Sequence, residues 1–220
     1  MQGHPKVRTV SSGDGPPIAF REGSWSRSLW QGRPDVGLFG LVELMDNNPI
    51  VCADEVSVPS PAGTLALIAL GPLARAALLS EPPVLMLSFE ASEDEIAAAL
   101  RSEGFDGGAT FHVAPQDLGR VRAATALAKI PMPEDMADLD ALYEEAFGRS
   151  FFVRRNEDSE WDVALVHGKP HAVYRMAVTP GEPDCLLRIQ VMADAEGKCG
   201  AAQLVHAFNV MIGCEETLGL

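Results

Sequence analysis

Positively charged residues are scarce in this sequence. It has 17 Lys and Arg against 31 Asp and Glu, which gives a formal net charge of −14 over 220 residues. A nucleic-acid-binding surface needs clustered Lys and Arg side chains that displace counterions from phosphates. The few basic residues between 149 and 155 are followed at once by Glu157, Asp158 and Glu160. We therefore expect no nucleic-acid partner, and the acidic surface favours solubility.

Long apolar runs are also missing. The longest, over residues 65–79, is interrupted by Gly71, Pro72 and Arg75, so it is too short to span a bilayer. Residues 1–10 have no apolar core of the kind that a signal peptide carries. These two features predict a cytoplasmic protein that does not bind a membrane.

Cysteine is sparse, with four residues: Cys52, Cys185, Cys199 and Cys214. No Cys-x-x-Cys pair occurs and no His stands at zinc-finger spacing from a cysteine, so we expect free thiols and no metal. Cys199 begins an expected helix, whose dipole would lower its pKa, but a small buried residue in a tight turn is the favoured interpretation. His112, His167 and His171 are interpreted as surface or packing residues.

Periodic apolar positions predict helices at residues 64–80, 92–104, 133–148 and 200–212. Ser92 and Glu95 form a capping box at the start of the second helix. Gly148 and Gly213 are expected to end the last two helices. Pro72 is expected to kink the first helix or to open a new one, because its ring nitrogen carries no hydrogen.

Runs rich in β-branched and aromatic residues predict strands at 84–89, 121–130, 151–153, 161–166, 172–178 and 186–192. Residues 1–38, rich in Gly, Ser and Pro, are expected to form an irregular lead-in segment with at most a short strand. Residues 39–220 are expected to form a single domain. Its fold class is predicted to be α+β, with a mixed, largely antiparallel sheet and helices on one face.

Five segments in order carry a family resemblance: 39–44 (Phe-Gly-Leu-Val-Glu-Leu), 56–73, 142–147 (Leu-Tyr-Glu-Glu-Ala-Phe), 166–168 (Val-His-Gly) and 194–220, which ends in Glu-Thr-Leu-Gly-Leu. They resemble the catalytic and dimerisation half of N-acetyl-γ-glutamyl-phosphate reductases, within the wider semialdehyde dehydrogenase group. The resemblance implies subunits that pair through their sheets. It also implies a thiolate that releases phosphate from an acyl phosphate, followed by hydride reduction of the thioester to an aldehyde.

The positions that carry this chemistry in the family hold other residues here. By the resemblance, Pro61 stands in place of the cysteine nucleophile and Ser92 in place of the imidazole base. Pro170 replaces the asparagine of Val-Arg-Gly-Ser-Asn, and Ala207 replaces the asparagine presented to the nicotinamide. The Gly-rich substrate loop before the base is deleted. Ser60, beside Pro61, is expected to cap a helix rather than to react.

A dinucleotide-binding domain is not expected either. It needs a strand, Gly-x-Gly-x-x-Gly and a helix, whereas Gly13-Asp14-Gly15 is followed by Pro16 and Pro17 and is interpreted as a loop. Only 38 residues precede Phe39, while such a domain takes on the order of 100 residues. We expect no catalytic residue, no NADP or other cofactor, and no metal ligand.

Three functions stay open at this point. The preferred hypothesis is a non-catalytic paralogue of the reductases that acts as a structural or regulatory protein-interaction subunit, as a homo-oligomer or with a different protein. The alternative is a small-molecule binder, or an enzyme of a different class, that uses the relic pocket beside Pro61. A split reductase completed by a separate cofactor chain ranks last. The preference rests partly on the final helix, because one of its faces would lack the neighbour that it contacts in the family. This face consists of Gln203, His206, Ala207 and Val210.

Overall fold

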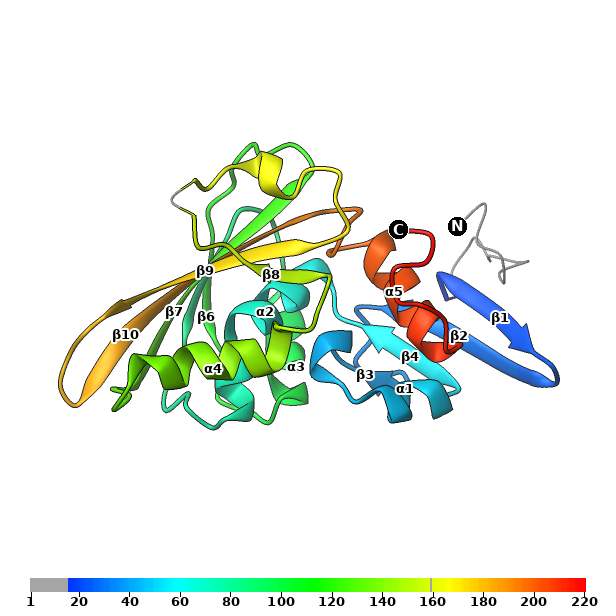
Figure 1. Ribbon diagram of the computed structural model, residues 1–220, viewed down its shortest axis with the longest axis horizontal. Coiled ribbons are helices and arrows are strands. Elements are labelled where there is room, and N and C mark those ends of the chain that lie inside the picture. Colours follow the sequence, from blue (N-terminus) through cyan, green and yellow to red (C-terminus); the bar gives the residue numbers. More distant parts are fainter. Residues whose placement is uncertain (1–15, 159) are drawn as a thin grey trace.

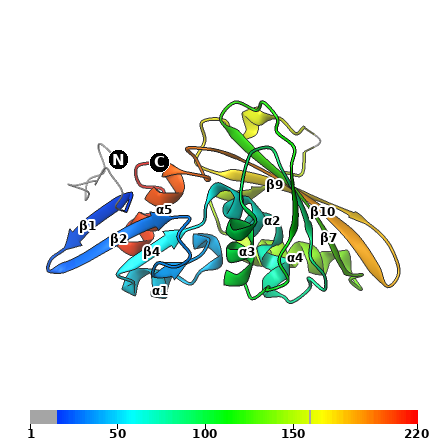
Figure 2. The same ribbon diagram turned by 180° about the vertical axis from the view of Figure 1, so that it is seen from behind.

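A computed structural model describes residues 16–158 and 160–220. They form two sheets that lie side by side (Figures 1 and 2). The larger has the strand order β6-β5-β7-β10-β9-β8 and the smaller the order β1-β2-β4-β3. The loop expected at Gly13-Asp14-Gly15 lies outside the described residues.

The larger sheet is mixed and largely antiparallel. Its strands are β5 (Val84–Leu87), β6 (Thr110–Val113), β7 (Val121–Pro131), β8 (Val153–Arg155), β9 (Ala172–Thr179) and β10 (Asp184–Asp194). β7 pairs antiparallel with β5 and β10, and β10 pairs antiparallel with β9. β6 and β8 join in parallel at the two edges. The α+β class and the type of sheet expected from the sequence are therefore confirmed.

One face of this sheet is covered by helices (Figure 1). They are α2 (Pro61–Arg75), α3 (Glu93–Ser102) and α4 (Met136–Phe147). α2 lies against β7 and β10, and its residues from 62 to 74 are all buried. It begins three residues before the predicted start and runs through Pro72 as one continuous helix, so no second helix opens at Pro72. Met136, at the start of α4, is exposed.

The opposite face carries a smaller apolar layer at one end only. Residues 161–166, predicted as a strand, instead contain a 3-10 helix, η2 (Val163–Leu165). Trp161 and Val163 pack against Val173 and Met192 on the sheet. The apolar residues that suggested a strand thus cover the sheet face rather than extending the sheet. Beside this layer, Met86 is 40% exposed and lines a hollow of about 430 Å³ together with Trp161 and Val163.

The smaller sheet includes residues that were expected to be irregular. β1 (Ile18–Glu22) and β2 (Trp25–Gln31) form a hairpin, and β2 pairs in parallel with β4 (Glu55–Val58), which also pairs with β3 (Leu38–Phe39). The prediction of an irregular segment over residues 1–38 is therefore wrong for residues 18–31. Arg27 and Leu29 alternate with more exposed neighbours, and a buried arginine hid this period-2 pattern. The Arg27 guanidinium donates to the carbonyls of Ile50, Val51 and Met211.

α1 (Asn47–Cys52) and α5 (Ala201–Met211) pack together beside this sheet. α5 is buried on all sides from residue 202 to 211. The face expected to lack a neighbour is therefore covered, and that part of the argument for an exposed α5 surface is wrong. Gln203 Nε2 donates to the Pro59 carbonyl, and His206 stacks on Phe152. No helix among the described residues is long and apolar enough to cross a membrane.

Candidate functional site

The segment that the sequence resemblance aligns with the family's nucleophile lies at the start of α2. Ser60 is the N-cap of this helix: its Oγ accepts a hydrogen bond from the Gly63 N–H at 3.2 Å and donates one to Glu95 Oε2 of α3 at 3.1 Å. The predicted capping role of Ser60 is confirmed. The hydroxyl therefore points its proton at a carboxylate of the neighbouring helix, and Pro61 itself offers no nucleophile.

The start of α3 lies next to the start of α2. Ser92 caps α3 by accepting from the Glu95 N–H at 3.3 Å, as the capping box predicts. A small cavity of about 140 Å³ lies between the two helix starts and the loop after β2, and it is lined by Gly32, Pro34, Phe39, Ser60, Asp94, Glu95 and Ala98. The structure thus brings together the segments of Pro61 and Ser92. Pro170, before β9, and Ala207, buried in α5, are not among the lining residues.

The thiol considered as a possible reactive group lies close to this place but is buried. Cys199 Sγ is 4.0 Å from the Pro61 carbonyl oxygen. Burial raises the pKa of Cys199 to about 12, against the opposing effect of the positive charges of Lys198 and Arg122. Helix α5 begins two residues later, at Ala201. The structure supports the interpretation as a small buried residue, and the hypothesis of a dipole-activated thiol is wrong.

The histidines singled out in the sequence do not gather. Burial, together with the charges of Arg154 and Lys169, lowers the pKa of His171 to about 4. His112 is exposed on β6. Over residues 16–158 and 160–220, no three His, Cys, Asp or Glu side chains come together in the manner of a metal site.

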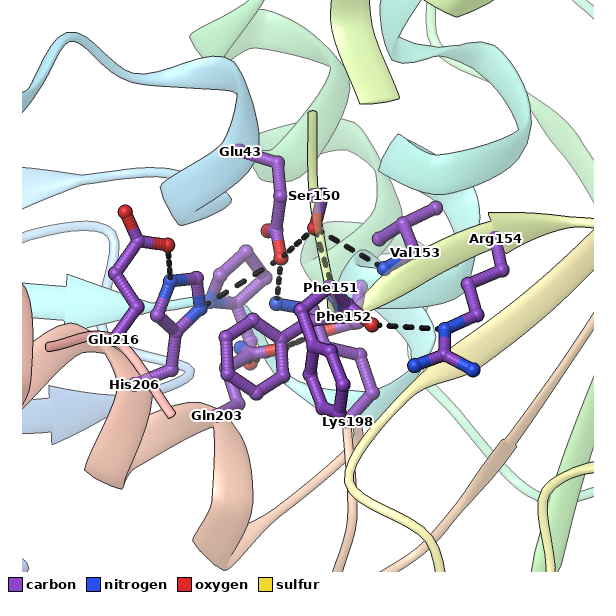
Figure 3. Close-up of polar contacts among 12 residues, drawn as sticks. Glu43, Ser150, Phe151, Phe152, Val153, Arg154, Lys198, Gln203, His206 and Glu216 are labelled. Atoms are coloured by element: carbon purple, nitrogen blue, oxygen red, sulfur yellow. Dashed lines mark hydrogen bonds and ion pairs between the residues drawn. The ribbon is translucent and has the colours of Figure 1, made fainter. Parts of the chain in front are cut away.

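A second group of polar side chains lies where five segments meet, and the sequence did not single it out (Figure 3). Glu43 comes from η1 (Val42–Leu44), Ser150 from the loop after α4, Lys198 from the turn before α5, His206 from α5 and Glu216 from the C-terminal segment. We call these five residues the Glu43 cluster. It joins the helical side of the larger sheet to α5 and the smaller sheet.

The centre of the Glu43 cluster is a buried ion pair. Lys198 Nζ lies 2.5 Å from Glu43 Oε1, and 0% and 3% of the two side chains are exposed. Ser150 Oγ donates to the same carboxylate oxygen at 3.3 Å. Burial alone would raise the pKa of Glu43, but Lys198 and His206 hold it below its ordinary value. Glu43 is therefore ionised at neutral pH.

His206 lies on the side of the Glu43 carboxylate that is opposite to Ser150 (Figure 3). Its Nε2 lies 2.9 Å from Glu216 Oε2, and its ring stacks on Phe152 at 4.1 Å between centroids. Its Nδ1 is 3.6 Å from Glu43 Oε1, too far for a hydrogen bond. Among the described residues, His206 Nδ1 and Glu43 Oε2 are buried and have no hydrogen-bond partner. Such unpaired buried atoms are rare in proteins.

A nucleotide cofactor does not fit α5. The resemblance implies that this helix presents a side chain to a nicotinamide, yet Ala207 is fully buried in an apolar cluster with Val42, Leu204 and Phe208. The smaller sheet packs against the same helix. A nicotinamide ring could contact Ala207 only by displacing this core.

Sequence reasoning missed the Glu43 cluster because nothing local marks it. Glu43 and Lys198 are 155 residues apart, and no motif connects them. His206 was assigned to an exposed helix face. The one available signal was that Glu43 and Lys198 are of opposite charge and both lie in segments with the family resemblance.

Comparison with known proteins identifies the fold. No family model matches the sequence, and no curated protein matches it. Aspartate semialdehyde dehydrogenase II from Vibrio cholerae is similar in structure, with a TM-score of 0.58 and 14% identity over 80% of this chain and 68% of that chain. The same enzyme complexed with ASA gives a TM-score of 0.54 at the same identity. At this identity the likeness concerns the fold alone, and the chain has the fold of semialdehyde dehydrogenases.

Proposed function

We propose that this chain is a non-catalytic paralogue of N-acetyl-γ-glutamyl-phosphate reductases that acts in the cytoplasm as a structural or regulatory protein-interaction subunit. The observation that carries the proposal is the start of α2. Pro61 stands at the nucleophile position, and the adjacent Ser60 hydroxyl is held by Gly63 and Glu95. Acyl transfer to the protein requires an activated nucleophile. Pro61 offers no nucleophilic atom, and the basic group in reach of the Ser60 hydroxyl is the Glu95 carboxylate rather than an imidazole.

The neighbouring thiol does not replace the lost nucleophile. With a pKa of about 12, Cys199 is a thiolate in only about one molecule in 10⁵ at pH 7. The Cys199 side chain is also buried, so a substrate cannot reach its sulfur without displacing the surrounding core. These two facts support a chain that has lost the reductase chemistry.

The uncovered face of the larger sheet supports the interaction role. Met86, Thr125 and Gln190 form one cross-strand row on this face. We call the whole face the open sheet face. Arg175 and Arg188 lie on the same face and line a hollow of about 460 Å³, which Glu157 and Asp158 also line. In a two-fold dimer the same surface meets itself, so it needs positive and negative groups that can pair and apolar side chains that can pack. This face carries both kinds of group. A second copy of this chain is the partner that we propose for it.

The alternative function places a small-molecule or enzymatic site beside Pro61. The cavity there is about 140 Å³, whereas pockets for drug-sized ligands occupy about 300–1,000 Å³. Its polar lining is two carboxylates and a capping hydroxyl that are explained by the helix starts. This observation favours the interaction role over the alternative.

The test is an assay of the purified chain with N-acetyl-γ-glutamyl phosphate and NADPH, alone and with an added dinucleotide-binding chain. We expect no oxidation of NADPH by the unmodified chain or by Pro61→Cys. Nucleophile, base and substrate loop act as a unit in catalysis, so adding the thiol alone does not restore activity. Light scattering on the same preparation is expected to give at least twice the chain mass of 23.5 kDa. Clear turnover by the unmodified chain, or tight NADPH binding, would contradict the proposal.

A further inference from the structure

Two side chains of opposite charge on the open sheet face have no partner within the chain. Arg188 projects from the inner strand β10, and Asp158 lies in the loop that follows the edge strand β8. Both are exposed, and both line the hollow of about 460 Å³. Within residues 16–158 and 160–220, neither side chain makes an ion pair or a hydrogen bond. In a single chain, water alone compensates these two charges.

The other charged side chains around this hollow are already engaged. Arg175 Nε donates to Gln190 Oε1 at 2.9 Å, which holds its guanidinium against the sheet. Arg155 Nη1 lies 2.8 Å from Asp140 Oδ1, and its Nε lies 3.8 Å from Glu157 Oε1. One guanidinium and one carboxylate of the hollow are therefore still available to a partner.

Covering the open sheet face would take water away from both of these groups. A charge that is buried in an interface without a counter-charge opposes binding. Each copy also carries a net charge of −14, which opposes association at long range. An interface between two copies therefore needs opposite charges that meet locally. Since its own chain offers Arg188 no carboxylate within reach, the carboxylate has to come from the other copy.

We propose that Arg188 of one copy pairs with Asp158 of the partner subunit when two open sheet faces meet. In a two-fold dimer a contact between two different residues is made twice, so one pairing satisfies both free charges in both copies. Pairs of this kind fix the register of two surfaces and reject arrangements that bring like charges together. The inference rests on the proposed association of two copies and adds which groups meet in it.

Charge reversal tests the pairing. Arg188→Glu would bring two carboxylates together at each contact, and Asp158→Arg would bring two guanidiniums together. Both positions are exposed, so both variants are expected to fold, which circular dichroism checks. We expect each variant alone to raise the dissociation constant of the dimer about tenfold or more, measured by light scattering over a dilution series.

Mixing the two variants gives the decisive measurement. In a mixed dimer the two reversed side chains meet at one contact, and the unchanged Asp158 and Arg188 meet at the other. Opposite charges then face each other at both contacts, so we expect an equimolar mixture to form dimers about as tightly as the unmodified chain. Repair within a single chain cannot produce this result, because neither variant contains both reversed residues.

Glu160→Arg is the matched control. It changes the net charge by as much as Asp158→Arg does, but Glu160 does not line the hollow. We expect it to leave the dimer intact, whereas an effect of net charge alone would make both variants associate more tightly. Dimers that persist in both reversed variants, or variants that stay monomeric when mixed, would overturn the pairing and leave the proposed association standing. A monomeric unmodified chain would contradict the proposed association as well.

Discussion

Among single residues, Glu43 and Lys198 have the largest expected effect on stability, because each is buried and each neutralises the other. Removing one partner of a buried pair leaves an uncompensated charge and costs about 3–5 kcal/mol. We expect Lys198→Met to lower the free energy of unfolding by about that amount in denaturant titrations. The double change Glu43→Gln with Lys198→Met should recover a large part of the loss, since no charge is then stranded. Equal losses in the single and double variants would contradict a mutually dependent pair.

Cys199 shows how burial can outweigh a helix dipole. The sequence placed this thiol at a helix start, where its pKa would fall, but burial raises its pKa to about 12. We expect a thiol reagent at pH 8 to label the exposed Cys52 quickly and Cys199 only after unfolding, because about one Cys199 side chain in 10⁴ is ionised and its sulfur is buried. Peptide mapping by mass spectrometry measures this, with Cys52→Ser as the control. Labelling of Cys199 in the native protein at the rate of Cys52 would contradict it.

Among the elements, α3 begins with a residue that carries both the family argument and the local structure. By the sequence resemblance, Ser92 aligns with the family's base position, and in the structure it caps the helix by accepting from the Glu95 N–H. We expect Ser92→Ala to lower the free energy of unfolding by about 1 kcal/mol. Ser92→Asp, which keeps an oxygen acceptor at the cap, should leave stability close to that of the unchanged protein. A folded Ser92→Ala protein with unchanged stability would show that the cap contributes nothing.

Elements whose signal is local could be predicted from the sequence, and elements defined by distant partners could not. The caps at Ser60 and Ser92 and the alternation along β7 follow from neighbouring residues alone. β2 was missed because its inward positions include Arg27, whose burial depends on carbonyls of α1 and α5. Burial of α5 on all sides likewise depends on the smaller sheet, which the sequence did not reveal. The caps at the starts of α2 and α3 are thus predictable, and the Glu43 cluster is not.

In the molecule as a whole, the two sheets share no strand. They are connected by the Glu43 cluster and by the packing of Leu41 and Leu44 against α2. α5 covers the smaller sheet, and its His206 reaches the loop after α4 through Phe152. Helices cover only one face of the larger sheet, and residues 161–166 cover one end of the other. Because α5 is buried, it cannot provide the exposed surface for association that the sequence suggested. The open sheet face is the surface that we propose instead.

The last prediction concerns that face. Met86 lies in its central cross-strand row, between β6 and β7, and is 40% exposed. If two copies pair across a two-fold axis, a glutamate at this position would be buried in each, near its own symmetry mate, and burying unpaired charge is costly. We expect Met86→Glu to reduce the mass measured by light scattering to that of one chain, 23.5 kDa. Met136→Glu is the matched control, because Met136 is 39% exposed on α4 on the helical side, and it should leave the larger mass unchanged. A chain that is monomeric before any substitution, with no partner recovered from its native host, would contradict the interaction role.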